Sequence, residues 1–86
     1  MRIGIVSRCD IEEATDLAAK IGRYIKGRAD AIYDDQTARA LGQEGMGLER
    51  FDVDVIVTVG GDGTILRVLQ NIPHPIPVVG INVGKV

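Results

Sequence analysis

The sequence predicts an α/β fold: an open, mostly parallel four-stranded sheet with three helices. Short runs rich in Ile and Val alternate along the chain with segments of helical periodicity. Glycine- or proline-rich breaks separate these segments. Strands that are joined through helices pair in parallel, so this alternation indicates a parallel sheet. The 86 residues correspond to one small domain.

The chain is expected to begin with a strand and an amphipathic helix. Residues 2–6 (RIGIV) are apolar enough for a strand that is covered on both faces. In the following segment, Asp10 offers an N-cap and Gly27 a C-terminal cap. Apolar residues recur between them at helical spacing and form one stripe: Ala14, Leu17, Ala18, Ile21 and Ile25.

The middle of the chain carries weaker signals. Residues 29–33 are a strand candidate, and residues 36–41 a short helix with Thr37 as its candidate cap. Glycines in the segment 42–47 then predict a loop. Residues 52–59 (DVDVIVTV) give the strongest strand signal, because they are rich in β-branched residues and end in glycines.

The last third is predicted to contain a turn, a helix and a strand. Residues 60–64 (GGDGT) form the turn, and residues 78–82 (VVGIN) the strand. Three prolines end the intervening helix and impose extended backbone before the strand. The apolar face of that helix is predicted to consist of Ile65, Leu66, Leu69 and Ile72. Three helices barely cover both faces of four strands, so we expect this chain to be a fragment of a longer protein.

Composition excludes several classes of function. A formal net charge of −2 gives no electrostatic footprint for nucleic acid or for an anionic membrane. The single cysteine cannot form an internal disulfide, and no segment has the pattern of a signal peptide or a membrane span. We therefore expect a cytoplasmic protein that binds neither nucleic acid nor a membrane.

The turn at residues 60–64 is the most informative feature for function. It joins a predicted buried strand to a helix, and ligands of open parallel sheets bind outside the carboxyl ends of the strands. Successive N–H groups of a glycine-rich turn, together with a helix N-terminus, suit phosphate. Thr64 can either cap the helix or donate its hydroxyl to a phosphate. The spacing fits neither a Walker A loop nor a dinucleotide-binding fingerprint.

Asp62 places a carboxylate inside this phosphate-binding turn, where negative charge opposes anion binding unless it has a task. It can accept a proton from an attacking hydroxyl, or it can help to hold Mg²⁺ between phosphates. The alternative is that Asp62 merely favours the turn, as Asp often does.

Two segments, DVDVIVTVGGDGTILR and PVVGINVG, together resemble the N-terminal part of the NAD kinases. GGDGT is shared with the diacylglycerol and sphingosine lipid kinases and, more distantly, with the phosphofructokinases. Residues 80–84 (GINVG) favour the NAD kinases. The resemblance implies that residues 1–86 form a Rossmann-like, phosphofructokinase-like nucleotide-binding domain, and that a C-terminal β-rich NAD-binding domain lies outside this chain. A lipid kinase domain and an inactive scaffold or interaction fragment are the alternatives.

The resemblance also implies a reaction and a set of site residues. A phosphoryl group passes from ATP, or from polyphosphate in some members, to the 2′-hydroxyl of the adenosine ribose of NAD, giving NADP. A divalent metal is needed, and we expect Mg²⁺. By position Asp62 is the proton acceptor, and the enzyme is expected to be a homo-oligomer. The residues expected to contact substrates or shape their pocket are Gly60, Gly61, Asp62, Gly63, Thr64, Arg67, Asn82 and Gly84.

Several of these residues have simpler interpretations. Arg67 lies off the predicted apolar stripe, so it is either a solvated helix residue or a cation that reaches the substrate. Asn82 and Gly84 either form a strand-to-loop turn or shape the floor of the pocket. Arg8 and Asp10 lie near the same crevice, where solvated and capping roles are expected. For Asp34 and Asp35 a polar turn is favoured over a metal site.

Overall fold

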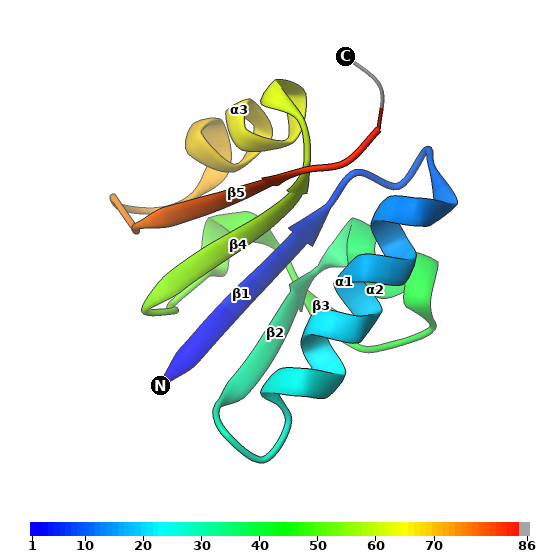
Figure 1. The fold of residues 1–86 in the computed structure, drawn as a ribbon. Helices are drawn as coiled ribbons and strands as arrows, with labels where there is room; N and C mark the ends of the chain where they lie inside the picture. Colours follow the sequence, from blue (N-terminus) through cyan, green and yellow to red (C-terminus); the bar gives the residue numbers. More distant parts are fainter. Residues whose placement is uncertain (85–86) are drawn as a thin grey trace.

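A parallel sheet with helices on both faces makes up residues 1–84, the part of the chain that the computed structural model describes (Figure 1). Lys85 and Val86, the last residues of the predicted domain, lie outside the described residues. In chain order the elements are β1 (Arg2–Ser7), α1 (Glu12–Ile25), β2 (Asp30–Asp34), α2 (Asp35–Leu41), β3 (Gly45–Met46), the 3₁₀ turn η1 (Leu48–Arg50), β4 (Val55–Gly60), α3 (Asp62–Asn71) and β5 (Val78–Asn82). The predicted α/β class and its three helices are confirmed.

The described part of the sheet has five strands rather than the predicted four. The additional strand, β3, has two residues, which pair in parallel with Tyr33 and Asp34 of β2. The sequence predicts a loop there because its glycines disfavour a strand. The pairing arises from α2, which returns the chain to the edge of β2.

The strand order is β3-β2-β1-β4-β5, with every pair parallel. From β1 the chain continues through α1 to β2 on one side, whereas β4 lies on the other side of β1. Ligands of doubly wound sheets bind at such a switch in strand order, outside the carboxyl ends of the strands. The register sets Ser7 of β1 beside Val59 of β4, and Gly60 beside Asn82 of β5. The ends of β1, β4 and β5 therefore meet at one edge.

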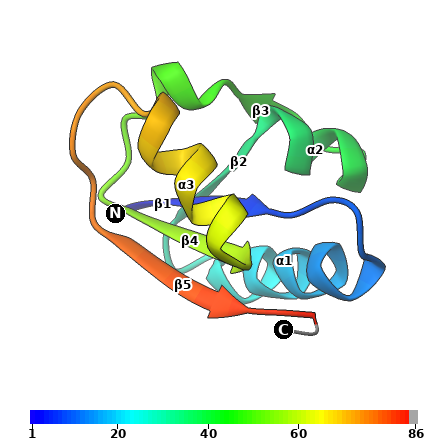
Figure 2. The same ribbon diagram turned by 90° about the horizontal axis from the view of Figure 1, so that it is seen from above.

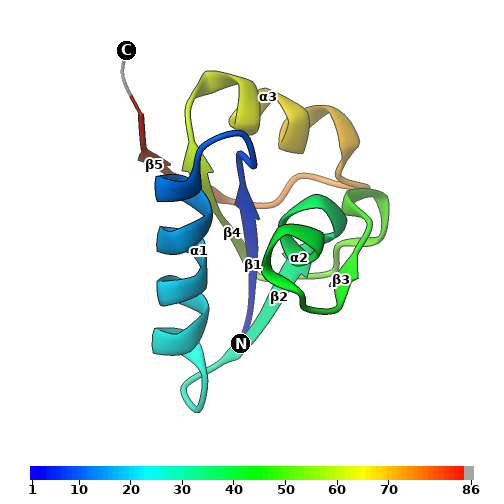
Figure 3. The same cartoon turned by 90° about the vertical axis from the view of Figure 1, so that its right-hand side faces the viewer.

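Two apolar layers hold the helices against the sheet. Helix α1 covers one face, while α3, α2 and η1 lie on the other (Figures 2 and 3). The layer under α1 confirms the predicted stripe and includes Ile5, Ala14, Ala18, Ile25 and Val59. The opposite layer includes Val6, Leu48, Phe51, Ile56 and Val68.

Helix α3 is rotated relative to the predicted apolar face. Leu66 and Leu69 are 54% and 56% exposed, whereas Thr64 and Val68 are buried. Thr64 lies directly beneath the glycine turn, and the side chain of Ile65 lies over Gly80 of β5. These two contacts in the first turn set the rotation of the helix, so the line Thr64–Val68 faces the core. A count of apolar residues alone misses this, because Thr64 is polar.

The structure also corrects the predicted helix caps. Ile11, not Asp10, occupies the N-cap position of α1. Asp34, not Thr37, caps α2 and accepts hydrogen bonds from the backbone N–H groups of residues 36 and 37. At the C-terminus of α1 the cap is Lys26, and the predicted Gly27 follows it with φ of +86°.

Candidate functional site

The glycine turn bends the chain sharply from β4 into α3. Gly60 ends β4 with φ of +155°, and a Cβ atom there would lie 2.6 Å from Oγ1 of Thr64. Gly60 is thus required by both conformation and space. Gly61 is the N-cap of α3, and a Cβ on Gly61 or Gly63 would meet nothing within 4 Å. The open space above these two glycines lets a ligand approach the backbone closely.

Two adjoining hollows flank this turn. The first, the arginine hollow, has a volume of about 340 Å³ and is lined by Arg8, Asp10, Gln36, Gly61, Asp62, Gly63, Thr64 and Arg67. The second, the strand-end hollow, has a volume of about 270 Å³ and is lined by Arg8, Gly60, Gly61, Asp62, Asn82, Val83 and Gly84. All eight site residues expected from the sequence line one or both hollows. The structure therefore brings together residues from both segments that carry the family resemblance.

Asp62 lies between the two hollows. It is the first residue of α3 and is exposed, and it contributes to the lining of both spaces. The positive end of the helix dipole stabilises a carboxylate at this position. The backbone N–H groups of Thr64 and Ile65 donate to the oxygen of Gly61, so those of Asp62 and Gly63 are the ones left for phosphate oxygens. A carboxylate thus stands beside backbone N–H groups that suit an anion.

Arg67 is not the solvated helix residue that its simpler interpretation predicts. Its side chain is only 25% exposed, and its Nη1 donates to Oδ2 of Asp34 at 2.9 Å. A second nitrogen, Nη2, donates to the backbone oxygen of Ser7 at 3.3 Å. The guanidinium is therefore fixed in the wall of the arginine hollow rather than solvated.

A buried polar network supports this arginine from below. The Asp34 side chain is 2% exposed, and besides capping α2 it accepts a hydrogen bond from the Thr37 hydroxyl. The same hydroxyl accepts from the backbone N–H of Ser7 at 2.8 Å. The ends of β1 and β2, the start of α2 and the middle of α3 are thereby connected. Residues 34 and 35 join β2 directly to α2 instead of forming the separate polar turn expected from the sequence. The bond from Arg67 to Asp34 joins residues far apart in sequence.

Arg8 and Asp10 form the exposed counterpart of that network. Nε and Nη2 of Arg8 donate to the two carboxylate oxygens of Asp10, each at 2.7 Å. These bonds lower the pKa of the Asp10 carboxyl to about 2. Arg8 is partly exposed, as expected, but it also lines both hollows. Its position directly after a strand that ends at the predicted crevice is the signal that could have identified it.

Asn82 and Gly84 form the rim of the strand-end hollow. The backbone N–H of Val83 donates to the oxygen of Gly60 at 3.0 Å, which holds the chain after β5 against the glycine turn. Gly84 has φ of +105°, and a Cβ there would lie 3.4 Å from Nη1 of Arg8. These positions fit the expected role in shaping the pocket.

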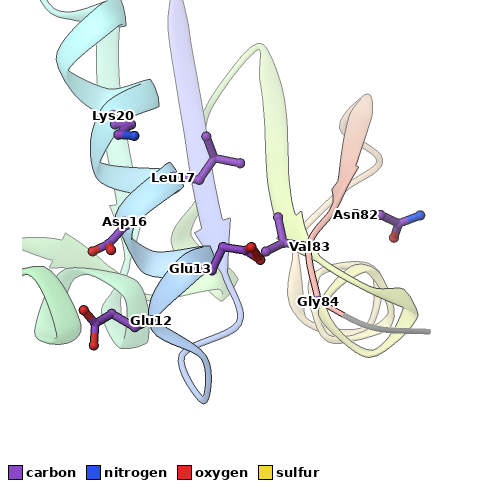
Figure 4. Close-up of a pocket in the computed structure, with 8 residues that line it drawn as sticks. All are labelled: Glu12, Glu13, Asp16, Leu17, Lys20, Asn82, Val83 and Gly84. Carbon is purple, nitrogen blue, oxygen red and sulfur yellow. The ribbon is translucent and has the colours of Figure 1, made fainter.

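A larger groove, of about 760 Å³, lies between α1 and the chain after β5 (Figure 4). Glu13 points towards Val83 across it, whereas Asn82 points away from α1. Three carboxylates and one ammonium line the groove: Glu12, Glu13, Asp16 and Lys20. This excess of negative charge disfavours phosphate, so the smaller hollows beside the glycine turn are the better candidates.

Two further properties bear on the type of site. Within residues 1–84, no three side chains of His, Cys, Asp or Glu gather closely enough to hold a metal ion by themselves. No helix in that part of the chain is both long and apolar enough to cross a membrane.

Comparison with known proteins yields consistent matches. The family model for the ATP-NAD kinase N-terminal domain matches residues 43–86. The NAD kinase of Methanocorpusculum labreanum is 41% identical over 88 residues, which cover 100% of this chain and 32% of that protein. The NAD kinases of Thermococcus kodakarensis and Pyrococcus abyssi are 44% and 45% identical over 89 residues, covering 98% of this chain and 32% of each protein. The chain thus spans about a third of the length of these curated relatives. The matches do not favour the lipid kinase alternative.

Proposed function

The chain belongs to the NAD kinase family, and we propose that the gene product carrying it phosphorylates NAD to NADP. In this reaction ATP donates a phosphoryl group to the 2′-hydroxyl of the adenosine ribose. One observation carries the proposal: the Asp62 carboxylate stands in the first turn of α3, shared by two hollows that meet at the glycine turn.

The geometry supports a division of labour among the residues of the site. A ribose hydroxyl is a poor nucleophile, and a carboxylate within reach of its proton assists attack on phosphorus. Asp62 takes that proton. The N–H groups of the first turn of α3 bind the phosphoryl oxygens and stabilise their charge during transfer. Because both hollows include Asp62, substrates placed in the two spaces meet at this carboxylate.

A divalent metal, for which we expect Mg²⁺, fits the donors present only in combination with substrate phosphates. Mg²⁺ in kinases is bound through one or two carboxylates together with phosphate oxygens, and does not require a cage of protein ligands. One carboxylate oxygen of Asp62 would hold it on the protein side, which would leave the other oxygen to accept the ribose proton. When bound, it would neutralise negative charge on the phosphates. Polyphosphate offers the same chemistry as ATP, so we include it as an alternative donor.

We further propose that the enzyme is a cytoplasmic homo-oligomer. Its NAD pocket is completed by a β-rich domain outside these 86 residues. Phosphoryl transfer depends on positioning both substrates, and the hollows described here form only one wall of such a pocket.

Replacement of Asp62 by Asn in the complete gene product tests the proposed function. Loss of a general base costs roughly 10²- to 10⁴-fold in rate, so we expect kcat for NAD phosphorylation to fall by that factor. Asn preserves the turn, so the melting temperature should not change. The matched control is Asp52→Asn, which removes an exposed carboxylate near the opposite end of β4 and should leave kcat unchanged. A near-normal kcat for Asp62→Asn would exclude Asp62 as the base.

A further inference from the structure

The ion pair between Arg8 and Asp10 stands at the centre of the site, yet the proposed reaction has not used it. Arg8 follows β1 directly, and its backbone N–H donates to the oxygen of Val59 at 2.9 Å. The strand ladder thus fixes the backbone of Arg8 beside β4. Its Cβ and Cγ atoms lie 3.2 and 3.1 Å from where a Cβ on Gly60 would stand, so the side chain passes directly over the glycine turn.

The Asp10 carboxylate engages Arg8 in the way that a phosphate would. Two parallel N–H···O bonds of 2.7 Å join the fork of the guanidinium to both carboxylate oxygens. Arginine forms the same two-pronged contact with phosphate. The other terminal nitrogen, Nη1, faces Gly84 at the strand-end hollow. The guanidinium is therefore presented to both hollows with its fork occupied by an internal anion.

Arg8 can exchange the Asp10 carboxylate for another anion more easily than Arg67 can exchange Asp34. The side chains of Arg8 and Asp10 are 34% and 67% exposed, and ion pairs so open to water contribute little to stability. Arg67, by contrast, is held by a carboxylate that is 2% exposed and that also caps a helix. Removing Arg67 from Asp34 would leave a buried charge unpaired, which is costly. Of the two arginines in the arginine hollow, only Arg8 can readily change partner.

We propose that Arg8 binds the terminal phosphates of the phosphoryl donor, and that Asp10 occupies its guanidinium until phosphate displaces the carboxylate. The inference rests on the proposed function and extends it to residues that the family resemblance did not carry over. A donor phosphate on Arg8 lies in the same hollow as Asp62 and the N–H groups of α3, where transfer must occur. Asp10 then competes with phosphate for Arg8, so the need to displace it reduces the affinity for phosphate. In the absence of phosphate, Asp10 keeps the guanidinium over the glycine turn.

The test measures binding of inorganic tripolyphosphate to the complete gene product by calorimetry, and separately the KM values for ATP and NAD. Arg8→Ala should weaken tripolyphosphate binding and raise the KM for ATP by at least about tenfold, with the KM for NAD unchanged. Arg8→Lys should weaken binding less, because it keeps the charge but loses the fork. Asp10→Asn should tighten tripolyphosphate binding by up to about fivefold, since the competing anion is gone.

Two controls separate this exchange from general electrostatics. Glu12→Gln removes a nearby carboxylate that lines the larger groove instead of the arginine hollow, so it should change affinity much less than Asp10→Asn. In the double variant Arg8→Ala/Asp10→Asn, the gain from Asp10→Asn should disappear, because the two residues act as a unit. Melting temperatures should stay within a few degrees throughout, since the pair is exposed.

The possible failures are distinguishable. If NAD is phosphorylated but Arg8→Ala binds tripolyphosphate normally, or Asp10→Asn binds it more weakly, the inference is wrong and the proposed function stands. If Arg8→Ala raises the KM for NAD rather than for ATP, the assignment to the donor is wrong. If the gene product binds tripolyphosphate in an Arg8-dependent way but does not phosphorylate NAD, the proposed function fails and the phosphate site remains.

Discussion

The ion pair between Asp34 and Arg67 should be among the most important polar contacts for stability. Asp34→Ala removes three things: the cap of α2, the acceptor for the Thr37 hydroxyl and the partner of Arg67. Loss of an Asp cap costs about 1 kcal/mol. Breaking a fully buried ion pair costs about 3–5 kcal/mol, but Arg67 is 25% exposed and regains some water, so about 1–2 kcal/mol is appropriate here. We expect Asp34→Ala to lower the free energy of unfolding by about 2–3 kcal/mol.

Asp34→Asn separates the charge from the cap. Asn caps helices about as well as Asp, so this variant should keep α2 intact and lose only the ionic part, about 1–2 kcal/mol. The measurement is urea denaturation of the 86-residue chain, followed by circular dichroism. All variants are compared at one protein concentration, because association would shift the apparent stability. For a domain of this size, each 1 kcal/mol corresponds to roughly 4–8 °C in the melting temperature.

The neighbouring Asp35 supplies the matched control. It is exposed in the first turn of α2, so Asp35→Asn should change stability by no more than about 0.5 kcal/mol. A double-mutant cycle with Asp34→Asn and Arg67→Met should give a coupling energy of at least about 1 kcal/mol. If Asp34→Asn were as stable as the wild type, or if the cycle showed no coupling, the ion pair between Asp34 and Arg67 would not stabilise the site.

Three further predictions concern the glycine turn and the isolated chain. Gly60→Ala should destabilise the fold by about 1–3 kcal/mol in urea denaturation, because its conformation and the nearby Thr64 hydroxyl exclude a methyl group. Gly61→Ala and Gly63→Ala should instead weaken ATP binding more than they lower stability; normal binding by either variant would contradict a backbone phosphate site there. The 86-residue chain alone should show no NAD phosphorylation and should sediment as dimers or larger species at micromolar concentration, since β5 is an edge strand and apolar side chains of α3 and β5 are exposed. A monomer, or turnover of NAD, would contradict this prediction.

Local signals in the sequence suffice for β5 and for the buried face of α1. The segment 78–82 forms β5 with the predicted bounds, and the apolar stripe of α1 faces the sheet as expected. In α1 the apolar side chains themselves specify which face is buried, so periodicity alone identifies it. The position of the glycine turn at the carboxyl edge follows from the parallel pairing of strands.

The sequence could not reveal the features that depend on partners distant along the chain. Thr64 and Asp34 are polar, and each is buried only because a second element supplies a hydrogen-bond or packing partner. Asp10 has the residue type and the position of a helix cap. Its carboxylate nevertheless binds Arg8 instead of the N-terminus of α1. Single-sequence rules assign such residues by their local preference, and the tertiary contacts override it.

The two ion pairs at the carboxyl edge of the sheet have different tasks. The pair of Arg67 with Asp34 positions the elements of the site, whereas the pair of Arg8 with Asp10 is available to bind phosphate. The strand order brings the ends of β1 and β4 together, so that an arginine from one strand lies over the glycines that follow the other. Behind them, Asp34 and Thr37 connect β1, α2 and α3 through hydrogen bonds that are buried or partly buried. The exposed pair in front can exchange its carboxylate for phosphate without disturbing that connection. Substitutions at Asp34 should therefore lower both the stability of the fold and the affinity for every ligand. Substitutions at Arg8 should change only the affinity for the phosphoryl donor.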